Sequence, residues 1–572
     1  MIRRRVPRGA HGGRLQCGLL ALALCCSGAV SSLSGCGETR LHPLIDASAS
    51  GGADAGGASA SGGAAAHDGG ATASAGLGPG GSAGETNPCV GCGVFPNRPV
   101  IVAPLPSDIA TRFGPAGSGA PSGGPCLIEP ESGSLFPRNW LPPRFSWSPF
   151  SARTAIEIRV HVDAEPSDLV VYTPDAAWTL DSATWRALAS EDSDRAIQIA
   201  TRSLNLDDPK AMPALGSQAT ITIAPADAPG TIAYSAAGTA IRGFRTGTPD
   251  VITLQHATAG RCLGCHTGTP GNTFIAYSEA AASDLPDGQS GAVLMRLARD
   301  RVSVATAVSS PTGLTLLARP GQHQATFTGA HWAAGDFRAI TLYQQQLTWT
   351  DLNATSTDVN VGWGQLSRTG DPGQAASGPQ WSHDGTFVLY ASGTGTDAGG
   401  IISKGDLYRV PYNAGMGGTA TPIAGASDAA WNEYYPSLSP DDRQVAYARV
   451  PRDEESFHNP AAEMFVIPVA GGTPQRIRAN DPAACLGAHS PGVTNSWPRW
   501  APAATVTNGR TFYFLTFSST RADGKLAQIY VTPVVIERAG VINTYPAIRL
   551  WNQAANEANY GPSWTALQLP PG

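Results

Sequence analysis

Charged side chains are scarce in this sequence. Asp, Glu, Lys and Arg together make up 14% of its 572 residues, and the formal net charge is −6 at pH 7. Such a surface lacks the basic patch that nucleic-acid binding needs, so we expect no nucleic-acid partner. Long segments with apolar residues at helical spacing are also missing, whereas Gly (67) and Pro (46) are abundant. The composition therefore favours short strands joined by turns.

The sequence patterns of several enzyme classes are missing too. The chain has no nucleophile elbow, no H-E-x-x-H and no phosphate-binding glycine loop that leads into a helix. The pair Asp441 and Asp442 falls at a turn, and the run 453–455 is most simply a solvated loop, so neither is assigned acid–base chemistry. The sequence therefore does not indicate whether the protein is an enzyme.

The N-terminus carries an export signal. Several arginines precede an apolar stretch from Leu15 to Val30, which is short for a membrane span and is followed by small residues. The stretch ends in Leu33-Ser-Gly-Cys36, which resembles the signal of bacterial lipoproteins, whose cysteine becomes the lipidated first residue. The resemblance implies a signal peptide over 1–35, lipidation of Cys36 and, because Gly37 follows, anchoring at the outer membrane. An ordinary cleaved signal or an uncleaved apolar tail are the alternatives.

Residues 36–86 are predicted to be a flexible tether. From Asp46 to Glu85 the chain consists almost entirely of Gly, Ala and Ser, which cannot bury enough apolar surface to offset the entropy of ordering. At roughly 5–6 Å times the square root of the residue number, such a tether holds the folded part on the order of 35 Å from its anchor.

One pentapeptide has the pattern of a cofactor-binding site. Cys262, Cys265 and His266 form a C-x-x-C-H, in which two thiols can bond covalently to a haem and the histidine can bind its iron as proximal ligand. We therefore expect one covalently attached haem c. The leading alternative is a Cys262–Cys265 disulfide beside an incidental histidine. Zinc is a weaker alternative, because no paired histidines supply the remaining ligands.

The distal ligand of such a haem is not specified by the sequence. Methionine is scarce, at five residues, and most of the eleven histidines lie far along the chain from the motif. The candidates are Met295, Met416, Met464, His256, His323, His331, His383, His458 and His489. A closed coordination sphere favours electron transfer, whereas an open one favours binding of a small molecule at the iron.

Four further cysteines are available for disulfides in an oxidising compartment. Cys89 and Cys92 lie in a predicted linker over 87–125, and Cys126 and Cys485 lie further on. Cys89-Val-Gly-Cys92 is followed by Gly93 and so lacks a proximal histidine. Four thiols allow three connectivities, which the sequence leaves open.

Residues 126–249 are predicted to form a small β-sandwich. The segments Ile156–Val162 and Ala219–Ile223 alternate apolar and polar residues, and Leu169–Tyr172 is a short apolar run. The opening segment, which contains Trp140 and Trp147, resembles the start of immunoglobulin-like and fibronectin-like modules, whose tryptophan packs into the core.

The second half of the chain contains repeats. Gly378–Ser392 and Tyr435–Arg449 share the pattern P-x-[W/L]-S-x-D-[G/D]-x-x-V-x-Y-A, and a degenerate copy begins at Trp497. A spacing of roughly 55 to 65 residues suits a four-stranded blade. The pattern resembles TolB-like, WD-related propeller repeats. The resemblance implies a β-propeller over 250–572, of about six blades, with Asn559–Trp564 closing the ring.

The haem motif lies inside the first of these repeats. It stands where other copies have Pro-x-Trp, just before a blade turn, and helices that would wrap a haem are absent around it. Such a chain resembles the haem-bearing propellers among exported bacterial redox proteins. We therefore expect an all-β, lipid-anchored propeller that carries haem c and takes part in electron transfer with a redox partner. The alternative is a cofactor-free propeller module that binds a protein or carbohydrate.

Overall fold

The computed structural model describes residues 93–151, 153–257, 261–271, 274–281, 291–296, 309–372, 375–395 and 400–569. The predicted signal peptide, Cys36, the tether, Cys89 and Cys92 lie outside these residues. Strands dominate the described chain, and its longest helix has 10 residues. None of the described helices combines the length and apolar character that a membrane crossing requires.

Two sheets form the β-sandwich that the sequence predicts. The larger sheet has the order β1 (Val100–Ile101), β6 (Leu169–Thr173), β5 (Thr154–Val162), β8 (Ala196–Asn205), β9 (Ala214–Ile223) and β3 (Leu135–Phe136). The smaller sheet has the order β2 (Cys126–Glu129), β4 (Arg144–Ser148) and β7 (Ala177–Thr179). The three predicted segments fall in β5, β6 and β9, because alternating apolar residues give each strand one face for the core.

The sandwich core is aromatic. Trp140 and Trp147 are each 4% exposed, as expected for tryptophans that pack inside such a module. The helix α3 (Ser182–Glu191) adds Trp185, whose indole donates a hydrogen bond to the carbonyl of Trp140 at 3.0 Å. The side chain of Asp181 caps α3 by accepting from the backbone of residues 183 and 184. A short helix, α2 (Ile109–Phe113), covers another part of the module.

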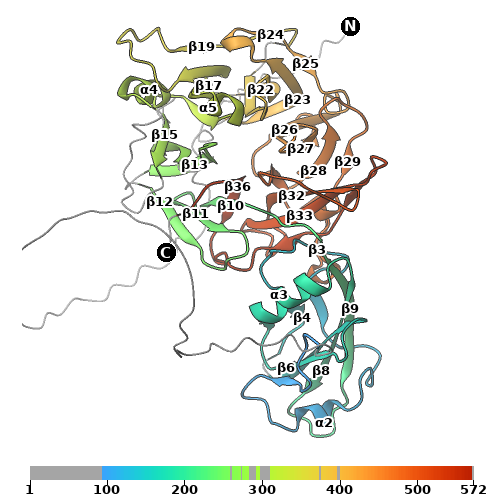
Figure 1. The fold of residues 1–572 in the computed structure, drawn as a ribbon. Helices are drawn as coiled ribbons and strands as arrows, with labels where there is room; N and C mark the ends of the chain where they lie inside the picture. The colour runs from blue at the N-terminus through green and yellow to red at the C-terminus, as the bar shows by residue number, and fades with distance from the viewer. Residues whose placement is uncertain are drawn as a thin grey trace, which may run out of the picture. The chain divides into compact units, whose positions relative to one another are not determined.

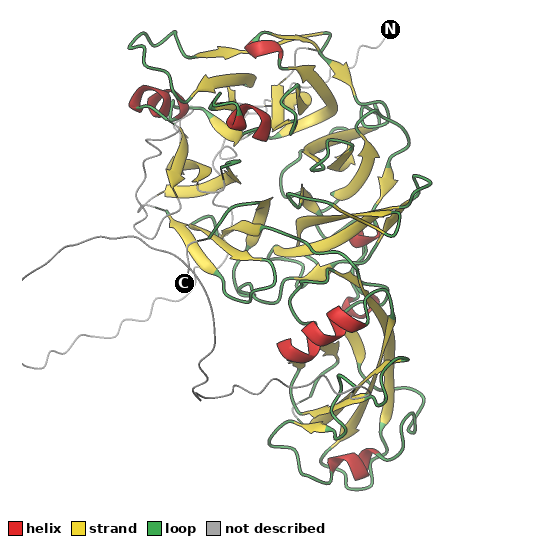
Figure 2. Cartoon of the chain, viewed as in Figure 1, coloured by secondary structure: helices red, strands yellow, loops and turns green. Residues whose placement is uncertain are grey.

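Six further sheets follow and form a β-propeller, as expected (Figures 1 and 2). Blade 1 contains β36 (Asn559–Thr565), β10 (Thr231–Ala236), β11 (Ala240–Arg245) and β12 (Ile252–His256). Blade 2 contains β13 (Arg261–Gly268), β14 (Phe274–Ala281) and β15 (Gly291–Arg296). Blade 3 contains β16 (His323–Thr326), β17 (Arg338–Tyr343), β18 (Gln346–Asp351) and β19 (Trp363–Gln365).

The remaining blades follow in chain order. Blade 4 contains β21 (Ala375–Trp381), β22 (Phe387–Gly395), β23 (Ile402–Pro411) and β25 (Thr421–Pro422); blade 5 contains β26 (Trp431–Leu438), β27 (Gln444–Pro451), β28 (Glu463–Pro468) and β29 (Gln475–Arg476); blade 6 contains β30 (Ser496–Trp500), β32 (Arg510–Ser519), β33 (Gln528–Ile536) and β34 (Ile542–Thr544), with β31 (Thr505–Thr507) and β35 (Ile548–Arg549) paired at its side.

Shorter elements join the blades. β20 (Ser367–Thr369), between blades 3 and 4 in the chain, pairs in parallel with β24 (Gly417–Thr419), which lies between the last two strands of blade 4. Blade 3 is preceded by α4 (Pro311–Leu317) and contains α5 (Gly329–Ala333), and 3₁₀ turns lie at η1 (Asn413–Gly415), η2 (Arg478–Asn480) and η3 (Ala484–Leu486).

The C-terminal strand closes the ring. β36 pairs antiparallel with β10, so Asn559–Thr565 completes a blade whose other strands come from Thr231–His256 (Figure 1). Closure by the segment around Asn559 was expected, but two of its partners were not. β10 and β11 fall within the range 126–249 predicted for the sandwich, so the propeller begins before residue 250. The haem motif therefore lies in the second blade of the propeller, not in the first as expected.

The predicted repeat is visible in its hydrogen bonds. At the turn of blade 4, the Ser382 hydroxyl donates to Asp384 at 2.7 Å and accepts from the backbone of Phe387 at 3.0 Å. Blade 5 repeats this arrangement with Ser439, Asp441 and the backbone of Gln444, at 2.7 and 2.9 Å. The serine and aspartate of each repeat therefore fix the turn between the first two strands of a blade.

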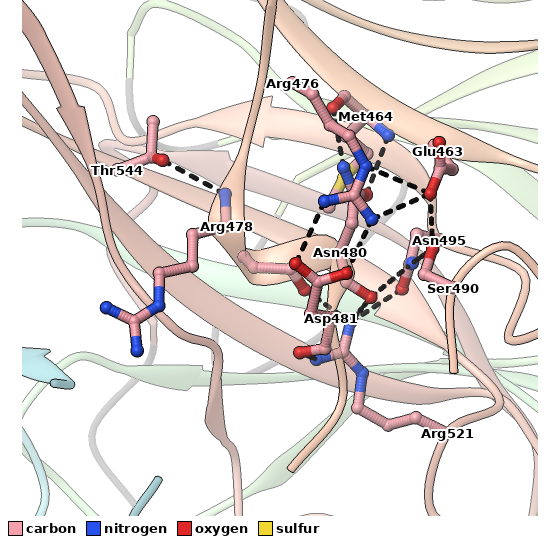
Figure 3. Close-up of polar contacts among 11 residues, drawn as sticks. Glu463, Met464, Arg476, Arg478, Asn480, Asp481, Ser490, Asn495, Arg521 and Thr544 are labelled. Carbon is pink, nitrogen blue, oxygen red and sulfur yellow. Dashed lines mark hydrogen bonds and ion pairs between the residues drawn. The ribbon is translucent and has the colours of Figure 1, made fainter. Parts of the chain in front are cut away.

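A disulfide and a polar network join the sandwich to the propeller. Cys126 at the start of β2 is bonded to Cys485 in η3, with 5.6 Å between the Cα atoms. This bond settles one pairing among the connectivities left open by the sequence. Close by, Arg478 donates to the carbonyl of Ser132 at 3.0 Å. The neighbouring Arg476 guanidinium bridges Glu463 and Asp481 (Figure 3). The network holds the loop that carries Cys485.

Candidate functional site

The innermost strand of every blade carries a β-bulge at the same point. The pairing register shifts within β13, β16, β21, β26, β30 and β36. Each shift centres on a residue two to four positions before the end of its strand. At each shift one residue adopts a positive φ between 49° and 59°: Cys265, Gln324, Gly378, Tyr435, Trp497 and Gly561. The six positions are therefore structurally equivalent.

Four of these six residues are not glycine, although a left-handed conformation costs other residues roughly 1–2 kcal/mol each. Bulges of this kind redirect side chains and concentrate next to functional sites. In four blades the next residue is proline (Pro379, Pro436, Pro498 and Pro562), and in blade 2 it is His266. The expected register, with the haem motif where other repeats have Pro-x-Trp, is thus the one observed.

The bulges surround a cavity of about 320 Å³. All six blades contribute to its wall, each through its innermost strand. Its volume lies at the lower end of the range of roughly 300–1,000 Å³ that is common for small-molecule sites. A sugar unit or an amino-acid-sized group matches this volume.

One side of the cavity is aromatic. Tyr435 and Trp497 stack with 5.2 Å between ring centroids and 17° between ring planes, and Tyr560 lies 6.0 Å from Trp497. Phe457 and His458 contact the same tryptophan from the loop before β28, at 5.9 and 5.4 Å. Burial lowers the pKa of His458 to about 4, so this imidazole is neutral at pH 7.

Arg499 brings a positive charge to the cavity. Its Nη1 donates to the carbonyl oxygens of Pro498 at 2.9 Å and Pro436 at 3.4 Å. Burial lowers its pKa to about 10, partly offset by the neighbouring Cys265 and Tyr435, so the guanidinium stays protonated at neutral pH. Within the described residues no carboxylate forms an ion pair with it, and none of those lining the cavity is Asp, Glu or Lys.

His266 is buried in the cavity wall. It is 7% exposed, and neither ring nitrogen has a well-formed hydrogen bond with the described residues, although the backbone of Ala233 lies close enough to act on the ring. Burial lowers its pKa to about 4, with the backbone of Ala233 opposing that shift and Arg499 adding to it. A neutral imidazole with an unused nitrogen is able to bind a metal or to accept a hydrogen bond from a ligand.

The three residues of the haem motif do not all line the cavity. Cys265 and His266 line the cavity, but Cys262 does not; its side chain is 4% exposed and lies opposite Ala280 of β14. A haem attached through C-x-x-C-H needs both thiols at its edge and the imidazole beneath its iron. The described arrangement of β13 does not fit that requirement, and covalent haem attachment stays a prediction from the sequence. Cys262 is disulfide-bonded whereas Cys265 is not, so the alternative of a Cys262–Cys265 bridge is contradicted.

The candidate distal ligands are dispersed. His331 contacts Asp336 at 2.7 Å, His323 contacts the carbonyl of Gly321 at 3.0 Å, and Met464 is fully buried in the core of blades 5 and 6. Met416 is 65% exposed, and the side chain of Met295 lies outside the described residues. His383 lines the cavity and contacts Asp442 at 2.7 Å. Over the described part of the chain, no three His, Cys, Asp or Glu residues come together as a metal site.

Sequence reasoning missed part of the cavity. Arg499 lies in the degenerate repeat copy that begins at Trp497, and the sequence nominates His458 only as a candidate distal haem ligand; nothing local indicates that these residues meet Phe457. Tyr435 and Trp497 stand in the aligned repeats, where the proline that follows each of them marks the bulge. The recurring x-Pro-x-Trp pattern was therefore a usable signal for the cavity wall.

The fold and the cavity define a class: a β-sandwich followed by a six-bladed β-propeller with a central site. No family model matches the chain, and no curated protein matches it. Solved structures resemble it weakly: the mitotic checkpoint complex (9% identity, TM-score 0.31, covering 57% of this chain and 78% of that one), a prolyl endopeptidase (10%, 0.27, 62% and 47%) and an oligogalacturonate lyase in complex with manganese (11%, 0.27, 59% and 85%). The match spans about half of the prolyl endopeptidase.

Proposed function

We propose that this protein is an extracytoplasmic binding module whose central cavity takes a carbohydrate unit or a small group of a protein partner. The observation that carries the proposal is the set of equivalent bulges, each of which turns one residue toward the cavity. Four non-glycine residues are held in left-handed conformations there, a local strain of the kind that clusters at binding sites.

The aromatic side of the cavity supports this class of ligand. Trp497, backed by the stacked ring of Tyr435, presents a flat, rigid surface on the cavity wall, which can stack against the apolar face of a sugar ring or against a planar side chain. Their backbone positions are fixed by the bulges, so little ordering entropy is lost on binding.

The first test is binding by the full chain to arrays of glycans and short peptides, followed by calorimetry on the ligands found. Trp497→Ala removes the stacking surface, and we expect binding at least tenfold weaker, about 1.4 kcal/mol. Val506→Ala, at a side chain 73% exposed on β31, is the control and leaves affinity unchanged. A Trp497→Ala variant that binds as tightly as the wild type contradicts a site in this cavity.

The export assignment belongs to the same proposal. A signal peptide over 1–35, lipidation at Cys36 and a tether over 36–86 place the propeller outside the cytoplasm, on an outer membrane. In a Gram-negative host, radiolabelled palmitate is expected in the wild type and absent from Cys36→Ser. Equal labelling of both proteins contradicts the anchor without affecting the cavity.

Haem c, with electron transfer as its role, is the second candidate. Its support is the sequence motif, together with the buried, neutral imidazole of His266 next to Cys265 on the cavity wall. Expression with haem c maturation machinery then gives a haem-stained band that survives denaturation, and Cys262→Ser with Cys265→Ser removes it. A wild-type chain without haem, produced beside a control cytochrome that matures normally, overturns this candidate.

A further inference from the structure

The described residues that line the central cavity carry positive charge and no negative charge. Among the described residues that line it there is one arginine, Arg499, and no lysine, aspartate or glutamate. His266 beside it is neutral at pH 7. An anionic ligand would therefore meet attraction without a competing carboxylate, whereas a cationic ligand would be repelled.

Arg499 uses fewer of its donors than other arginines of this chain. Arg521, which also has no carboxylate partner among the described residues, donates from Nε, Nη1 and Nη2 to oxygens of Ser519, Asp481, Ala479, Asn480 and Asn495. Arg202 forms a bidentate pair with Glu157 at 2.9 and 2.5 Å, and Arg452 forms one with Asp406 at 2.7 and 3.1 Å. For Arg499 the described residues supply two carbonyl oxygens, both to Nη1. A guanidinium has five N–H donors, and burying its charge without a counter-ion is costly, so a ligand anion would complete the site.

The size and charge of the cavity favour a carboxylate. The planar fork of arginine matches the two oxygens of a carboxylate, and one such pair balances the single cation. A phosphate dianion would leave excess negative charge in a cavity of about 320 Å³.

The rest of the wall suggests what carries the carboxylate. Amide and hydroxyl groups from Gln324, Gln380, Ser437 and Ser563 line the cavity opposite or beside the aromatic stack. Such a wall can hydrogen-bond to several hydroxyls while a ring face lies on Trp497. We propose that the cavity binds an acidic sugar, a uronic acid unit, with its carboxylate on Arg499; this inference rests on the binding function proposed above.

The test is calorimetry on the full chain with three probes: glucuronate, glucose and inorganic phosphate. Glucuronate and glucose share a ring and differ at the carboxylate, so their affinity ratio reports the contact with Arg499. We expect glucuronate to bind at least tenfold more tightly than glucose, and phosphate to bind more weakly than glucuronate. Arg499→Gln should remove the preference for glucuronate while leaving glucose unchanged, and Arg499→Lys should retain part of it.

Arg538→Gln is the matched control, because Arg538 is an exposed arginine of the same blade; it should behave as the wild type. Circular dichroism checks that each variant is folded. If glucose and glucuronate bind equally tightly and Arg499→Gln changes neither affinity, the inference is overturned, whereas the proposed binding function is unaffected. Phosphate binding more tightly than glucuronate overturns the carboxylate assignment. Failure of both sugars to bind the wild type overturns the acidic-sugar site, while ligands found on the arrays still decide the proposed function.

Discussion

Single buried residues set part of the pH dependence of this protein. Glu433 on β26 is fully buried, and its Oε2 accepts from the backbone of Asp428 at 3.2 Å while Oε1 has no hydrogen-bond partner within the described structure. Burial raises its pKa to about 8; Asp406 and Asp428 add to the shift, and Arg449 and the hydrogen bond oppose it. The folded protein therefore holds a proton that the unfolded chain releases near pH 4.5.

We predict that Glu433→Gln removes this pH dependence. In the wild type, the stability that the neutral carboxyl contributes is complete below pH 4.5 and is lost as the pH rises to about 8. The variant should thus gain stability relative to the wild type between pH 5 and pH 8, by on the order of a few kcal/mol at about 1.4 kcal/mol per pKa unit. Urea unfolding at both pH values measures it, with exposed Glu191→Gln as the control. A difference that does not change with pH contradicts the prediction.

At the scale of elements, β36 decides whether the ring is closed. Its Trp564 is 4% exposed, donates from its indole to the carbonyl of Pro229 at 2.9 Å and lies 6.0 Å from Trp140. The strand thus links the closing blade to the core of the sandwich.

We predict that Trp564→Ala lowers the free energy of unfolding by about 3–5 kcal/mol, because a large buried side chain leaves a cavity. Trp363→Ala is the matched control: Trp363 lies half-buried on the outermost strand β19 under the guanidinium of Arg319. Its removal should have a smaller effect, about 1–2 kcal/mol. Equal losses in the two variants would show that β36 has no special part in stability.

The elements themselves were largely predictable. The repeats around Trp381 and Leu438 indicated the blades, because serine and aspartate side chains form their turns through local contacts. The start of the propeller was missed, because β10 pairs with β36, which joins residues more than three hundred positions apart, and nothing local in the sequence indicates that pairing. At the site, the bulge at Cys265 interrupts the strand alternation, so the sequence motif did not reveal that Cys262 and Cys265 face different surroundings.

At the scale of the whole molecule, the Cys126–Cys485 bond encloses a sequence separation of 359 residues. A loop of that length is much more restricted in the unfolded chain once it is closed. We predict that Cys126→Ser with Cys485→Ser lowers stability by about 2–5 kcal/mol. Denaturant unfolding of the oxidised wild type and the variant measures the difference, and coincident curves contradict the prediction.

The pairing of β36 with β10 also bears on the order of assembly. A chain is synthesised from its N-terminus, so β10 exists long before its partner β36, which follows it by more than three hundred residues. Until Asn559–Thr565 has emerged, blade 1 lacks its inner strand, and Tyr560 and Ser563 are missing from the cavity wall. A chain that has been synthesised only as far as blade 6 consequently has an incomplete cavity wall, so the central cavity forms only after residues 559–565 have been made.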